Sequence, residues 1–71
     1  MVLVTRQGCH LCDKALQLLR ELGAEPELAD VDADDELFRL YDWRVPVILR
    51  DGAVVAEGKI KRDALEQALG S

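Results

Sequence analysis

This chain of 71 residues contains no long hydrophobic run. A transmembrane helix needs about 20 consecutive apolar residues, and the apolar stretch at residues 1–4 is also too short for the core of a signal peptide. These absences predict a protein without membrane association, and we expect a cytoplasmic location. The length is enough for one small domain, residues 1–71.

Cysteine and histidine are scarce, with two cysteines and one histidine in the whole chain. Two cysteines cannot build the disulfide framework of a small secreted protein. A structural zinc ion needs four ligands, so the chain would have to add carboxylates or a second subunit to hold one. We therefore expect the two cysteines to carry out chemistry and not to cross-link the fold.

Positive charge is also in short supply, because 14 acidic side chains outnumber 9 lysines and arginines and leave a net charge of −5. This balance argues against a surface for nucleic acid or for an anionic membrane. The acidity is concentrated in residues 21–42, which contain nine acids and a single base, Arg39. The simplest interpretation of this segment is a solvated face. We expect the chain to be a monomer.

The apolar residues that are present predict alternating strands and helices. Residues 2–5 form a short apolar run rich in β-branched side chains, which is typical of a buried strand. Apolar residues then recur at helical spacing over residues 11–22, and Gly23 is suited to end that helix. Residues 27–32 are expected to form a second strand. A short helix with acids in its first turn should follow and run to Tyr41, with Leu37 and Leu40 facing inward.

The last third of the chain predicts a hairpin and a final helix. Residues 45–49 are expected to be a strand, joined through Asp51 and Gly52 to an antiparallel strand at residues 53–56. The final helix should begin near residue 59 or 60 and end at Gly70. The resulting order, βαβαββα, predicts an α/β fold in which three helices flank a four-stranded mixed sheet. Its first two strands should be parallel and the hairpin should form an antiparallel edge.

The residues with chemical potential are Cys9-His10-Leu11-Cys12, a C-x-x-C directly after a strand and at the start of a helix. Thiols at this spacing can close a disulfide, and the helix N-terminus favours the thiolate of the first one. We expect Cys9 to be the nucleophile and Cys12, one turn further in, to be the more buried resolving thiol. Arg6 and Arg44 are expected to add positive charge beside Cys9, and His10 is either a spacer or a further local charge.

Two other interpretations of the cysteines remain open at this point. The thiols could be ligands in a metal or metal–sulfur carrier, or they could be core residues without a role in an interaction module. Haem attachment would need a histidine directly after the second cysteine, where Asp13 stands. Tyr41 and Trp43, just ahead of the third strand, are expected to serve packing, and the alternative is that Trp43 shapes the rim beside Cys9.

The motif in this position, followed by Val45-Pro46 at the start of a strand, a hairpin and a last helix, resembles the thioredoxin fold. Within that fold, the chain resembles the small glutaredoxin-like proteins over nearly its whole length. The resemblance implies that Cys9 attacks a disulfide, that Cys12 resolves it, and that Pro46 is a cis proline facing the pair. It also implies that the backbone of Val45 pairs with bound peptide or glutathione, and that Arg6 meets a glutathione carboxylate.

The sequence departs from glutaredoxins at three places. His10-Leu11 stands between the cysteines in place of Pro-Tyr, Arg44 replaces the threonine before Val45-Pro46, and the usual pair of glycines near the last helix is reduced to Gly58. We therefore expect no bound cofactor and weakened glutathione binding, although Arg6 and Arg44 could still hold a carboxylate. The expected partners are a protein disulfide and either a dithiol reductase or glutathione.

Overall fold

The structure, a computed structural model, describes residues 1–70. Its elements are β1 (Val2–Thr5), α1 (His10–Glu21), β2 (Glu27–Asp30), α2 (Asp35–Tyr41), β3 (Val47–Arg50), β4 (Ala53–Glu57) and α3 (Arg62–Gly70). The sheet has the strand order β2-β1-β3-β4, in which β1 and β2 are parallel and the other neighbours antiparallel. The expected α/β fold, a thioredoxin-like arrangement, is confirmed. The last residue of the predicted domain 1–71, Ser71, lies outside the described residues.

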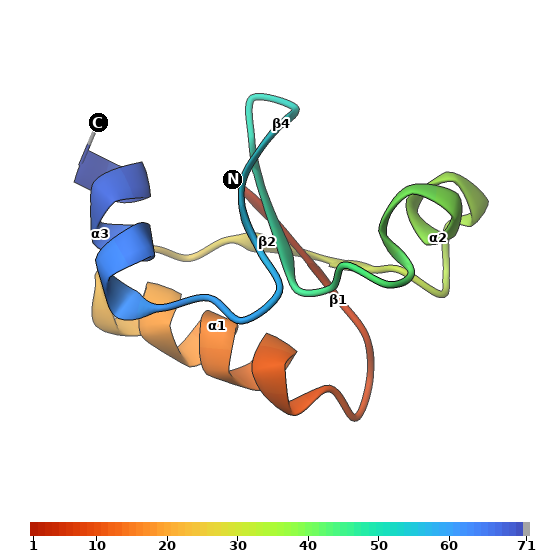
Figure 1. The fold of residues 1–71 in the computed structure, drawn as a ribbon, viewed down its shortest axis with the longest axis horizontal. Helices are drawn as coiled ribbons and strands as arrows, with labels where there is room; N and C mark the ends of the chain where they lie inside the picture. The colour runs from red at the N-terminus through yellow and green to blue at the C-terminus, as the bar shows by residue number, and fades with distance from the viewer. Residues whose placement is uncertain (71) are drawn as a thin grey trace.

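The helices lie on both faces of the sheet, with α1 and α3 on one side and α2 on the other (Figure 1). Successive residues of a strand point to opposite faces, so β1 serves both cores. Leu3 packs with α1 and α3, whereas Val4 packs with the α2 side. The α1–α3 core is formed by five buried residues: Leu3, Ala15, Leu19, Ile48 and Leu65. Within residues 1–70, no helix is long and apolar enough to cross a membrane.

Local signals located most element ends correctly. Gly23 follows α1 with a φ of 84°, in the left-handed region that glycine tolerates. Asp51 and Gly52 both have positive φ, 54° and 81°, as the two central residues of a type I′ hairpin turn require. The helix α2 is capped by Asp34, whose side chain accepts hydrogen bonds from the N–H groups of Glu36 and Leu37.

Three element boundaries differ from expectation by two or more residues. Strand β2 ends at Asp30 and not at residue 32, because the Asp30 side chain accepts the N–H of Asp32 and starts a turn. Strand β3 begins only after Pro46. Helix α3 begins at Arg62 and not at residue 59 or 60.

Two side chains expected inside the fold are outside it. Leu40 is 45% exposed, so the prediction that it faces inward was wrong, whereas Leu37 does pack against the Val4 core. Helix α2 has only seven residues, and none of them is fully buried. Leu37 and Tyr41 pack against the Val4 core, and Leu40 does not. Tyr41 packs as expected, but Trp43, in the turn after α2, is 95% exposed and has no interior role.

Candidate functional site

The two cysteines lie at the first turn of α1 and are both free thiols in this structure. Cys9 is the N-cap residue of the helix, and its Sγ accepts a hydrogen bond from the N–H of Cys12 at 3.2 Å. A cap position normally holds an oxygen that satisfies an orphan N–H of the first turn. A sulfur in that position is held against the positive end of the helix, where negative charge is stabilised. The geometry therefore places the Cys9 sulfur at the N-terminus of α1, in contact with a backbone N–H.

Cys12 has the opposite environment. It is only 2% exposed, whereas Cys9 is partly exposed. Burial, followed by a hydrogen bond to Cys9, raises the pKa of the Cys12 thiol to about 12. Cys12 is therefore protonated at neutral pH, and of the two thiols only Cys9 is suited to attack a molecule from solution. The expected difference in burial between the two cysteines is confirmed.

Pro46 is buried, and its peptide bond with Val45 is cis, as the resemblance implied. The loop around it is tied to the end of β4, because Gly58 N–H donates to the carbonyls of Arg44 and Pro46 at 3.2 and 2.9 Å. The N–H of Val45 donates to the carbonyl of Tyr41 at 3.2 Å. A substrate strand that used this N–H would have to replace that bond. Substrate binding by Val45 and Pro46 stays a prediction.

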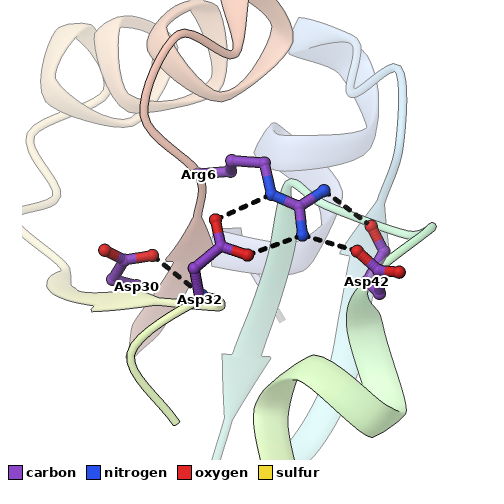
Figure 2. A network of polar contacts seen from close by, with 4 residues as sticks. All are labelled: Arg6, Asp30, Asp32 and Asp42. Atoms are coloured by element: carbon purple, nitrogen blue, oxygen red, sulfur yellow. Dashed lines mark hydrogen bonds and ion pairs between the residues drawn. The ribbon is translucent and has the colours of Figure 1, made fainter. Parts of the chain in front are cut away.

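Arg6 forms polar contacts with two other segments of the chain, at Asp32 and at Asp42 (Figure 2). Its guanidinium donates to both carboxylate oxygens of Asp32, each at 2.9 Å, and to the carboxylate and the carbonyl of Asp42. Its own carbonyl accepts the N–H of Cys9 at 3.3 Å. Arg6 thus connects the loop before Cys9 to the turn after β2 and to the end of α2. Asp32 and Asp42 are residues that sequence reasoning missed.

The guanidinium of Arg6 is already paired with the carboxylates of Asp32 and Asp42. Two carboxylates neutralise the charge that was expected to support Cys9, and a glutathione carboxylate would have to displace one of them. The pairing raises the pKa of Arg6 and lowers the pKa of Asp32, in each case mainly through the side-chain hydrogen bonds between them. Substrate binding by Arg6 stays a prediction. In the structure, its side chain links the turn after β2 to the end of α2.

The Arg6–Asp32 pair should make stability depend on pH. The pKa of Asp32 is lower in the folded chain than in the unfolded one, so the pair stabilises the fold above the ordinary aspartate pKa of about 3.9. That stability is lost as the pH falls further, through the folded-state pKa. We expect Asp32→Asn to lower the urea midpoint at pH 7, and the difference from wild type to shrink steadily below pH ~4.

A matched control is Glu27→Gln, which removes an exposed carboxylate at the start of β2. It should leave the urea midpoint nearly unchanged, both at neutral pH and below pH ~4. The measurement is urea unfolding followed by circular dichroism. A deficit of Asp32→Asn that stays constant from neutral pH to about pH 3 would contradict the ion-pair explanation.

Arg44 is engaged in a similar way. Its Nε donates to the Glu57 carboxylate at 2.8 Å, and its guanidinium lies 5.2 Å from the centre of the Tyr41 ring. Like Arg6, it brings little unpaired charge to the motif. Its role in substrate binding stays a prediction. His10, the first residue of α1, is exposed.

The arrangement of possible metal ligands bears on the carrier alternative. Among residues 1–70, no group of three or more His, Cys, Asp or Glu side chains is placed to hold a metal ion.

Comparisons with known proteins agree with the fold described above. The family model described as Glutaredoxin-like domain (DUF836) matches residues 1–70. A solved structure is also similar, with a TM-score of 0.83 and 30% identity over 97% of this chain and 93% of the other. It is the X-ray structure of the structural genomics target protein XcR50 from X. campestris. No curated protein sequence matches at a significant level.

Proposed function

The chain belongs to the glutaredoxin-like family (DUF836), and from this premise we propose that it is a thiol–disulfide oxidoreductase working through Cys9 and Cys12. The observation that carries the proposal is the contrast between the two thiols. Cys9 is partly exposed and accepts an N–H at the start of α1, whereas Cys12 is buried and protonated. Cys9 is thus suited to attack the substrate disulfide, and Cys12 is suited to resolve the mixed disulfide afterwards.

The first step forms a mixed disulfide. The Cys9 thiolate attacks one sulfur of a substrate disulfide, so that a bond forms between Cys9 Sγ and that sulfur while the second substrate sulfur leaves as a thiolate. The N–H of Cys12 holds Cys9 Sγ in position before the attack. In the mixed disulfide, Cys9 Sγ no longer carries a negative charge. The hydrogen bond between Cys12 and Cys9, which contributes to the raised pKa of Cys12, therefore weakens.

The second step releases the product. Cys12 loses its proton to the departing thiolate and attacks Cys9 Sγ, which forms the Cys9–Cys12 disulfide and frees the remaining substrate thiolate. Two electrons have then passed from the protein to the substrate. A dithiol reductase or glutathione would return the oxidised protein to the dithiol form. In this proposal the substrate backbone lies along the loop at Val45 and Pro46, like an added strand.

The proposal is tested by counting thiols in a metal-free sample. The reduced protein should show two titratable thiols per chain after denaturation, because the sequence has two cysteines. After incubation with a disulfide-linked peptide it should show none, and the peptide should be recovered in reduced form. Dithiothreitol should restore both thiols. Thiols that disappear only when a metal ion is added would support the carrier alternative instead.

A further inference from the structure

A groove of about 320 Å³ begins at the cysteine motif and runs between α1 and the segment before α3. Its floor is aliphatic and its rim is basic. The lining residues are Leu11, Lys14, Leu18, Lys59, Ile60, Lys61 and Arg62. Leu11 stands between the two cysteines and is 43% exposed. The groove therefore meets the cysteine motif at Leu11, two positions after Cys9 in the chain.

All three lysines of the chain, Lys14, Lys59 and Lys61, line this one groove. All three are exposed, and within residues 1–70 none of them has a carboxylate partner. The arginines behave differently, because five of them form ion pairs with Asp or Glu and Arg50 donates to a backbone carbonyl. On a chain with a net charge of −5, the three lysines, which have no carboxylate partner among residues 1–70, are thus gathered in one groove.

We propose that this lysine groove, formed by the seven lining residues, binds an acidic segment of the protein whose disulfide Cys9 attacks. The inference rests on the proposed function and specifies its substrate class. Charge complementarity identifies the occupant: carboxylates meet the lysine rim while an apolar side chain covers the aliphatic floor. Glutathione fits less well, because its α-ammonium group needs an acceptor and none of the lining residues offers a carboxylate.

The distance dependence of charge explains how an acidic protein can recruit an acidic partner. At physiological salt, charges are screened beyond about 8 Å. A partner that touches the groove therefore feels the nearby lysines more than the acids spread over the rest of the surface. Local fields of this kind raise association rates by about tenfold or more.

The test compares three disulfide-linked peptide dimers of the form Cys-Leu followed by three Glu, three Gln or three Lys. We expect the reduced protein to react with the Glu peptide about tenfold faster than with the Gln peptide, and slowest with the Lys peptide. Raising the salt from about 0.05 to about 0.5 M should remove most of this preference. In the Lys59→Gln/Lys61→Gln variant, the ratio of the Glu rate to the Gln rate should fall towards one.

Two variants serve as controls. Arg20→Gln/Arg39→Gln makes the same change in net charge outside the groove and should keep the wild-type ratio. Lys59→Arg/Lys61→Arg retains the charge of the rim and should also keep it. A ratio that falls equally in the Arg20→Gln/Arg39→Gln variant would overturn the proposal, since net charge alone would then explain it.

A binding measurement separates this proposal from the proposed function. A fluorescent Glu peptide without cysteine should bind the wild type more tightly than the Lys59→Gln/Lys61→Gln variant, whether or not any disulfide is reduced. If no peptide is reduced but this difference is found, the proposed function fails and the groove stands. If all three peptides are reduced at equal rates, the groove proposal fails alone.

Two other occupants are outcomes that would contradict the proposal. Reduction of glutathione disulfide that falls in the Lys59→Gln/Lys61→Gln variant as much as the Glu peptide reaction does would assign the groove to glutathione. A wild type that dimerises in sedimentation experiments, with a variant that does not, would assign it to a second copy of the chain.

Discussion

Replacing Cys9 by serine should reduce disulfide reduction to the background of the assay, whereas replacing Cys12 by serine should trap mixed disulfides with the substrate. In Cys9→Ser, the hydroxyl that takes the place of the thiol would not form the anion that attacks sulfur at neutral pH, so the first bond cannot form. In Cys12→Ser, Cys9 still caps α1 and still attacks, but no thiol within the chain remains to release the product. Mass spectrometry of the intact protein after mixing with a peptide disulfide distinguishes the two results.

Alkylation at pH 7 provides a second readout that needs no substrate. In Cys12→Ser the remaining thiol is the partly exposed Cys9, whereas in Cys9→Ser it is Cys12, which is 2% exposed and has its pKa raised mainly by burial. We expect iodoacetamide to react at least about a hundredfold more slowly with Cys9→Ser than with Cys12→Ser. Rapid alkylation of Cys9→Ser with mixed disulfides formed through Cys12 would reverse the assigned roles.

Leu19→Ala should remove a large part of the stability of the domain. Leu19 is fully buried between the sheet and α3, with Leu3, Ile48 and Leu65 around it. Truncating a buried leucine costs about 2–5 kcal/mol, and a domain of this size is typically stable by roughly 4–10 kcal/mol. We therefore expect a strongly lowered urea midpoint and a measurable unfolded fraction at about 37 °C.

The matched control is Leu40→Ala, the same change on another helix at a side chain that is 45% exposed. It should alter the free energy of unfolding by no more than about 0.5 kcal/mol. Circular dichroism is the better probe, because the single tryptophan, Trp43, is 95% exposed and its fluorescence will respond little to unfolding. Equal losses for the two variants would contradict the division between core and surface described above.

Several features of this protein follow from short stretches of sequence. The helical spacing in α1, the acids at the start of α2 and the Asp51-Gly52 turn depend on neighbouring residues, because periodicity and backbone dihedral angles are local properties. The position of the cysteines between a strand and a helix is local too, and it predicted that both lie at a helix N-terminus and that Cys12 is the more buried. Element order and fold class follow from the same signals.

Other features depend on residues far apart in the chain. Arg6 binds Asp32 and Asp42, which are 26 and 36 positions away, and Arg44 binds Glu57, 13 positions away. No short-range pattern shows which carboxylate an arginine will meet, so the expectation of positive charge from Arg6 and Arg44 beside Cys9 did not include these ion pairs. The exposure of Trp43 was missed for a similar reason, since an aromatic residue after a helix is buried only if a second layer covers it.

The sequence by itself therefore determined the elements, their order and the pair of thiols, because these depend on spacing and on turn chemistry within about a dozen residues. Only the tertiary structure decided which arginines pair with carboxylates and where the lysines gather. The three lysines are spread from residue 14 to residue 61, and they form one groove because α1 and the segment before α3 pack side by side against the sheet. Charges at such separations in the sequence become neighbours only through packing, because no local pattern brings residue 14 close to residues 59 and 61.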